Sequence, residues 1–153
     1  MAVLLVVLGL VCLHRGDRLM LILCFAGPLL AVAVTELVAK PFVGRFRAGA
    51  DQYPSGHCTA AAAVSAVALL ILCRPSEHAG RWWVGCAVMP AVLVFVAVQH
   101  LGWHDLTEAL AGLAAGAGTV SALAAALLRL PRGYAADRLP QSDIKRVVSR
   151  RAS

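Results

Sequence analysis

Three groups of polar residues interrupt a strongly apolar chain, and each has side chains that could bind or transfer a phosphoryl group. The middle group, Pro54-Ser55-Gly56-His57, stands directly before a long Ala-rich run. Proline suits the first turn of a helix, Ser55 can cap that helix, and Gly56 lets an anion approach the backbone. The unpaired N–H groups and the dipole of such a helix end favour phosphate, and His57 could protonate a leaving oxygen. A plain capped helix with an interfacial histidine is the alternative.

The first group runs from Lys40 to Arg47, just upstream. These two residues are seven positions apart, so on a continued helix they would lie on one face, about two turns from each other. Lysine offers a compact positive charge, and arginine offers a planar fork that can bind two phosphate oxygens. Arg45, between them, is an auxiliary candidate. The alternative is ordinary snorkelling of basic side chains at the end of a membrane helix.

The third group contains His104 and Glu108, which are four positions apart and would be neighbours on a helix that begins near Asp105. A carboxylate that holds one ring nitrogen fixes the tautomer and leaves the other nitrogen free as a nucleophile. His100 is also four positions from His104, so a zinc site of His100, His104 and Glu108 is a second interpretation. Gly102 would interrupt such a helix, and a zinc site would leave the basic group unexplained. We therefore expect no metal.

The composition indicates that membrane helices position these groups. The chain has 153 residues, of which 60% are hydrophobic and 14% charged, which is too apolar for a soluble domain of this length. Runs of about 20 apolar residues can cross a bilayer. Four such runs are present: Met20–Val38, Pro54–Cys73, Trp82–Leu101 and Asp105–Leu128. Met1–Cys12 is shorter, and we interpret it as a truncated or mis-started first helix.

The expected fold class is therefore all-α, a polytopic transmembrane helical bundle. Residues 1–130 would form the transmembrane domain, and residues 131–153 a basic, flexible tail. Alternating spans put eleven of the 14 Lys and Arg residues on the side of the tail and only Lys40, Arg45 and Arg47 on the other. The positive-inside rule then predicts a multi-pass protein of the plasma or inner membrane, with a cytoplasmic tail and the three polar groups outside. The net charge of +6 reflects this asymmetry and predicts contact with membrane lipids, not nucleic acid.

In this order and across these spans, the three groups resemble the type 2 phosphatidic acid phosphatase (PAP2) superfamily of membrane lipid phosphatases. The first family motif is Lys, six residues, Arg-Pro, which matches Lys40 and Arg47 with Ala48 in place of Pro. The second, Pro-Ser-Gly-His, is intact at residues 54–57. The third is Ser-Arg, five residues, His, three residues, Asp, and it matches His104 and Glu108. The resemblance covers roughly Glu36 to Gly112.

Two departures from the family pattern affect the expected site. The Ser-Arg pair aligns with Ala97-Val98, so one phosphate-binding guanidinium group of the family is absent. The loss of a charged contact to phosphate costs about 1.5–3 kcal/mol. Glu108 replaces the usual Asp and keeps the carboxylate with a longer reach. Three nearby side chains could compensate for the missing arginine: Arg45, Gln99 and His100.

The resemblance implies a two-step phosphoryl transfer that uses no metal or other cofactor. His104 would attack phosphorus and form a phosphohistidine, with Glu108 orienting its ring. His57 would protonate the departing lipid alcohol and then activate water. The groups that would bind the phosphate oxygens are Lys40, Arg47, Ser55 and Gly56.

The expected activity is therefore that of a phosphatase on a lipid phosphate or diphosphate. Candidate substrates are a polyprenyl diphosphate or monophosphate, a phosphatidylglycerol phosphate, and phosphatidic acid. One alternative is a lipid phosphotransferase that passes the same phosphoryl group to another acceptor. Another is a catalytically impaired PAP2-like protein that only binds lipid headgroups, which the valine at position 98 favours. The sequence names no protein partner.

Overall fold

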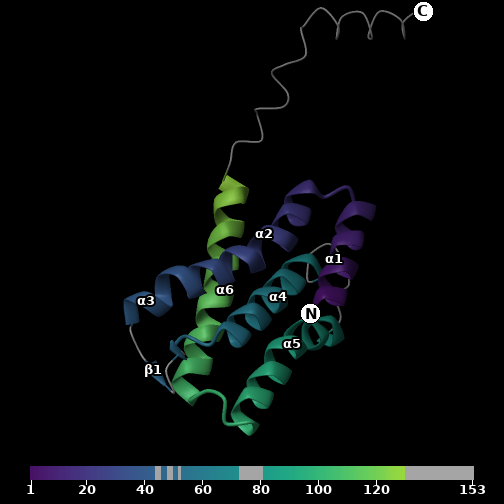
Figure 1. Ribbon diagram of the computed structural model, residues 1–153. Coiled ribbons are helices and arrows are strands. Elements are labelled where there is room, and N and C mark those ends of the chain that lie inside the picture. The colour runs from purple at the N-terminus through teal and green to yellow at the C-terminus, as the bar shows by residue number, and fades with distance from the viewer. Residues whose placement is uncertain (44–45, 48–49, 52, 73–80, 130–153) are drawn as a thin grey trace, which may run out of the picture.

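The computed structural model describes residues 1–43, 46–47, 50–51, 53–72 and 81–129. The described chain is a helical bundle, as the composition predicts (Figure 1). Its helices are α1 (Ala2–His14), α2 (Arg18–Val34), the π-helix η1 (Thr35–Ala39), α3 (Lys40–Val43), α4 (Gly56–Leu72), α5 (Arg81–His100) and α6 (Leu106–Arg129). Two strands of two residues each, β1 (Phe46–Arg47) and β2 (Ala50–Asp51), pair antiparallel with Arg47 opposite Ala50. The tail predicted for residues 131–153 lies outside the described residues.

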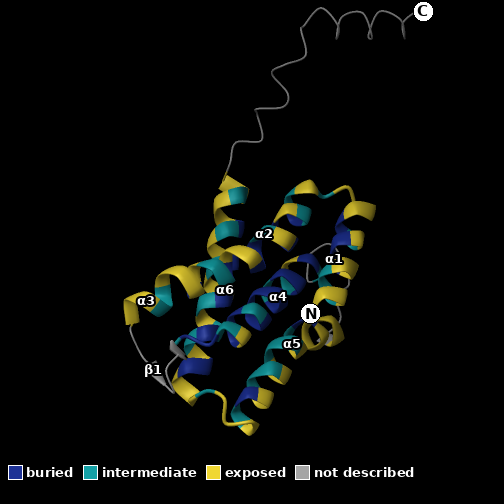
Figure 2. Ribbon diagram, viewed as in Figure 1, coloured by how far each residue is buried: buried dark blue, intermediate teal, exposed yellow. Residues whose placement is uncertain are grey.

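Helix α4 forms the centre of the bundle. It contacts α1, α2, η1, α5 and α6, and Figure 2 shows buried residues along most of its length. Small and β-branched side chains such as Ala63, Val64 and Val67 are fully buried and allow the neighbouring helices to approach closely. A core of buried apolar residues then joins α1, α2, α4 and α6, with Leu8 and Val120 among its members.

The outer surfaces of the bundle are apolar. Leu29 on α2 is 72% exposed and Trp82 on α5 is 87% exposed. Helices that are hydrophobic on their outward faces need an apolar surrounding, and the bilayer provides it. Among the described residues, three helices are long and apolar enough to cross a membrane: Arg18–Val43, Trp82–His100 and Leu106–Arg129.

Three of the four predicted spans coincide with these long helices, and the fourth does not. The predicted span Pro54–Cys73 corresponds to α4, which begins only at Gly56 and has 17 residues. At 1.5 Å per residue, such a helix is about 26 Å long, less than the bilayer's hydrocarbon core. Its neighbours enclose it, so lipid need not match its length. α1, with 13 residues, is shorter still, as expected for the segment Met1–Cys12.

The proline inside α5 is accommodated by the neighbouring helix. Pro90 lacks an N–H and disturbs the hydrogen-bond ladder of α5. The backbone N–H of Ala91 donates to the Ser65 hydroxyl on α4, at 3.2 Å. A side chain of α4 thus satisfies a backbone group of α5, as apolar surroundings require.

Candidate active site

The three polar groups lie at one end of the bundle, opposite the α1–α2 turn and the C-terminal end of α6 (Figure 1). The first group follows α2 and η1, the second opens α4, and the third joins α5 to α6. The ring centroids of His57 and His104 are 6.2 Å apart, and those of His57 and Trp103 are 5.9 Å apart. The second and third groups therefore meet in space, as their topology predicts.

Glu108 both caps helix α6 and holds His104. It is the third residue of α6, and its Oε2 accepts the N–H of Asp105, the residue before the helix, at 3.1 Å. This is the geometry of a capping box. The same Oε2 lies 3.1 Å from Nδ1 of His104, and Glu108 is 3% exposed. An ionised carboxylate can only accept, so with Glu108 ionised and the ring neutral this contact requires the proton to be on Nδ1 and leaves the lone pair on Nε2.

The end of α5 places His104 within reach of Glu108. Gly102 has φ +63° and ends the helix, as expected. The N–H of Trp103 donates to the Val98 carbonyl and that of Gly102 donates to the Gln99 carbonyl, both at 3.1 Å. This pair of bonds is a Schellman motif, and glycine takes its left-handed position without steric cost. The chain therefore turns sharply after α5, and His104 lies just before α6, close to Glu108.

The start of α4 is joined directly to the start of α6. The backbone N–H of Ser55 donates to the Glu108 carbonyl, at 3.1 Å. The hydroxyl of Ser55 accepts the N–H of Cys58, at 3.4 Å, and so caps α4 as predicted. Ser55 is fully buried, whereas His57 is exposed. The serine thus fixes the helix end, and the histidine faces outward beside His104.

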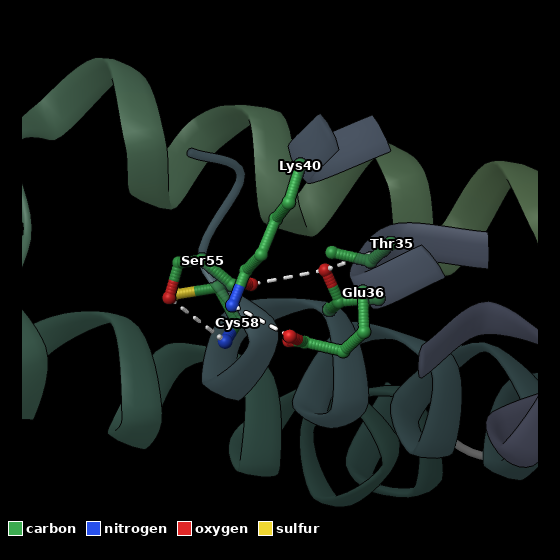
Figure 3. Close-up of polar contacts among 6 residues, drawn as sticks. Thr35, Glu36, Lys40, Ser55 and Cys58 are labelled. Atoms are coloured by element: carbon green, nitrogen blue, oxygen red, sulfur yellow. Dashed lines mark hydrogen bonds and ion pairs between the residues drawn. The ribbon is translucent and has the colours of Figure 1, made fainter. Parts of the chain in front are cut away.

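Lys40 reaches the start of α4 from the end of the first long helix. Its Nζ lies 2.7 Å from Oε2 of Glu36, four residues earlier (Figure 3). A Cβ atom added to Gly56 would lie 2.5 Å from Oε1 of the same glutamate, so the carboxylate packs against the first residue of α4. The cation of the first group therefore lies beside the second group.

The π-helix η1 helps to set this position. A π turn adds a residue to the helix and rotates the next turns about its axis, and such turns recur at functional sites. Thr35, the first residue of η1, is fully buried and donates to the Thr59 hydroxyl at 3.3 Å. Thr59 in turn donates to the Ser55 carbonyl at 2.9 Å (Figure 3). These buried hydroxyls link η1 to the first turn of α4.

Other predicted residues are placed differently or lie outside the described part. The helix ends at Val43, so Lys40 and Arg47 do not lie on one continuous helix face, and Arg47 is part of β1. Pairing between β1 and β2 replaces the expected helical turns there. Arg45 lies outside the described residues. His100 is exposed at the end of α5.

The position of the missing family arginine is a packed apolar position. Val98 is 2% exposed and packs with Cys58 and Ala109. Next to it, the side-chain nitrogen of Gln99 is buried and has no hydrogen-bond partner among the described residues. Val98 therefore packs α5 against the first turns of α4 and α6, and it contributes no charge to the site.

The zinc interpretation is not supported by the donor set. His104 contacts Glu108, but the described residues contain no group of three His, Cys, Asp or Glu side chains placed to hold a metal ion, and His100, His104 and Glu108 are all described. Gly102 separates His100 from the other two because it ends α5.

Two glycines of α6 allow this helix to pack closely against α4 at the site. A Cβ atom on Gly112 would collide with the Ser55 carbonyl, and one on Gly116 would collide with the Thr59 carbonyl. Both glycines are buried against α4. Small residues at this spacing let two membrane helices approach closely. The approach brings the first turn of α6 to the first turn of α4.

Several residues of this end of the bundle were missed by the sequence interpretation. The spacing of Glu36 and Lys40 is that of an ion pair on a helix, so a helical pattern could have revealed it. Thr35 and Thr59 carry no such signal, because single threonines occur in many membrane helices. Their link depends on two segments that only the fold brings together.

The arrangement brings together two imidazole rings, a buried carboxylate and the N-terminal end of a helix. The ring of His104 contacts Glu108, His57 lies beside it, and Lys40, paired with Glu36, lies next to the start of α4. This combination suits transfer of a phosphoryl group.

Comparison with known families supports this chemistry. Comparisons with curated proteins and with solved structures gave no match. The family model of the PAP2 superfamily matches residues 31–132, a region that contains all three polar groups. The match extends over more than half of the chain, and the superfamily generally comprises phosphatases. With its apolar helices, this chain is a membrane protein that belongs to the PAP2 superfamily.

Proposed function

We propose that the protein hydrolyses a lipid phosphate or diphosphate through a phosphohistidine on His104, at the extracytoplasmic side of the membrane. The observation that carries the proposal is the contact between Nδ1 of His104 and the buried carboxylate of Glu108, with His57 beside them. A histidine held in this way has a fixed tautomer and a fixed ring plane. Nε2 then has the lone pair that attacks phosphorus.

The first step forms the bond from Nε2 of His104 to phosphorus and breaks the bond from phosphorus to the lipid oxygen. His57, as an imidazolium, gives its proton to that oxygen, and the lipid alcohol leaves. From a lipid diphosphate, the bond that breaks joins the terminal phosphorus to the bridging oxygen, and the lipid monophosphate leaves. In the second step, His57 takes a proton from water, which attacks phosphorus and releases His104 and inorganic phosphate. Lys40 and the N–H groups at the start of α4 would stabilise the charge on the phosphate oxygens.

The position of the site at the helix ends supports a lipid with a phosphate headgroup as the substrate. Apolar outer faces such as those of α2 and α5 contact lipid chains, and a phosphate headgroup lies at the level where helices end. The excess of basic residues on the side of the tail supports an extracytoplasmic site. Polyprenyl phosphates and diphosphates, phosphatidylglycerol phosphate and phosphatidic acid all meet this description.

Phosphate release by the purified full-length protein in detergent tests the proposal. A panel of these lipids is supplied to the wild type, to His104→Ala and to His14→Ala, whose exposed histidine lies in the last turn of α1. We expect His104→Ala to abolish release and His14→Ala to keep it. Mass spectrometry of rapidly quenched wild type is expected to show one added phosphoryl group. Undiminished release by His104→Ala would exclude the phosphohistidine.

A further inference from the structure

Glu36, which belongs to none of the three polar groups, lies against two parts of the proposed phosphate subsite, Lys40 and the start of α4. One carboxylate oxygen is 2.7 Å from Nζ of Lys40, and the other packs on Gly56 at the first residue of α4. Figure 3 shows both side chains reaching toward the start of α4. A carboxylate and a phosphate seek the same partners, a cation and the N–H groups of a helix end.

The two members of the ion pair differ in their freedom to move. The side chain of Lys40 is 17% exposed, whereas that of Glu36 is 41% exposed. The backbone before Glu36 is anchored because Thr35 is buried and bonded to Thr59. The carboxylate can therefore swing into water, while Lys40 stays beside α4.

A phosphate bound beside Lys40 would meet the negative charge of Glu36. An anion bound by both Lys40 and the start of α4 would lie against the carboxylate of Glu36, and the repulsion would oppose its binding. The phosphate and the carboxylate thus exclude each other. Only one of them can neutralise Lys40 at a time.

We propose that Glu36 is an internal competitor for the phosphate subsite, a residue that sets how tightly the site holds phosphate. In the empty site it would neutralise Lys40 and keep this side chain at the start of α4. When the second step has produced inorganic phosphate, the returning carboxylate would favour its release. This inference rests on the proposed function, in that the subsite is taken to bind phosphoryl groups.

Binding of inorganic phosphate to the full-length protein in detergent tests this role, measured by isothermal titration calorimetry. Glu36→Gln keeps the shape and can still accept from Lys40, but it removes the negative charge. We expect Glu36→Gln and Glu36→Ala to bind phosphate about tenfold more tightly than the wild type and to show a lower KM for the lipid phosphate. Asp17→Asn is the matched control, because Asp17 caps the far end of the same helix and asparagine caps equally well.

The sign of the change separates competition from a purely structural role. A residue that only positioned Lys40 would weaken phosphate binding when it was altered. Unchanged or weaker binding by both Glu36 variants, with melting temperatures like that of Asp17→Asn, would overturn the proposal even if the wild type hydrolyses lipid phosphates. Conversely, tighter binding without any hydrolysis by the wild type would support the role of Glu36 and refute the phosphatase.

Discussion

At the scale of single residues, one carboxylate oxygen both caps a helix and holds a histidine ring. Oε2 of Glu108 accepts the N–H of Asp105 and holds Nδ1 of His104. The capping bond fixes the carboxylate on the first turn of α6, so the histidine meets an acceptor that is already in place. Glutamate reaches back to the N–H from the third helical position, where the family motif usually has aspartate.

Substitution of Glu108 by glutamine is expected to separate the two roles. Glutamine can still cap Asp105 through its side-chain oxygen, so the melting temperature in detergent should change little. Its neutral amide cannot stabilise a positively charged imidazole ring, and loss of the charged hydrogen bond costs about 1.5–3 kcal/mol. We expect kcat to fall roughly tenfold to a hundredfold. Glu108→Ala should lower both kcat and the melting temperature, and a wild-type kcat for Glu108→Gln would contradict the orienting role.

At the scale of helices, the site depends on how closely α6 approaches α4. Gly112 touches the backbone of Ser55, and the Ser55 N–H donates to the Glu108 carbonyl. Helix α6, which carries Glu108, and the start of α4, which Ser55 caps, are thus held at backbone contact. Gly118 lies on the same helix as Gly112, and a Cβ atom added to it would meet open space.

Alanine at these two glycines should act in opposite directions. Gly112→Ala forces α6 away from α4, and overpacking of this kind costs about 1–3 kcal/mol. It should also lower kcat, because the Ser55–Glu108 bond stretches. Gly118→Ala meets no neighbour and should leave kcat unchanged while raising helix stability by up to about 1 kcal/mol. Melting temperature and kcat of the two variants, measured side by side, check this, and equal behaviour would mean that the contact is unimportant.

At the scale of the whole molecule, the polar site lies at the opposite end of the bundle from Arg15 and Arg129. Arg15 donates to the Ile71 carbonyl near the end of α4, and Arg129 ends α6. Lys40, His57 and His104 lie at the other end. The separation agrees with an orientation in which the end with Arg15 and Arg129 faces the cytoplasm.

Reporter fusions to the C-terminus test this orientation. In a bacterial inner membrane, a green fluorescent protein placed after Ser153 should fluoresce, because it folds in the cytoplasm. An alkaline phosphatase placed at the same point should be inactive, because it needs the oxidising periplasm. The reverse pair of results would place the site on the cytoplasmic side and exclude an outer-leaflet substrate.

Several features of this protein could be predicted from the sequence alone, and all of them lie within single segments of the chain. Apolar runs predicted the long helices at residues 20–38, 82–101 and 105–128, since a helix in lipid satisfies its own backbone. Spacing along the chain predicted that His104 and Glu108 are neighbours and that Gly102 ends a helix. Each of these depends on residues within one continuous segment of the chain, so local geometry is enough.

The contacts between the three groups depend on the three-dimensional packing of the helices. Two contacts join segments that are distant in sequence: Glu36 packs against Gly56, and the Ser55 N–H donates to the Glu108 carbonyl. Ser55 is buried as a result of this packing. The enclosure of α4, too short for a typical span, also depends on its neighbours. These features arise because side chains of neighbouring helices fit together. The hydropathy and residue spacing of one helix do not show which helix packs against it. The proposed phosphate subsite therefore depends on the packing of α4 against η1 and α6.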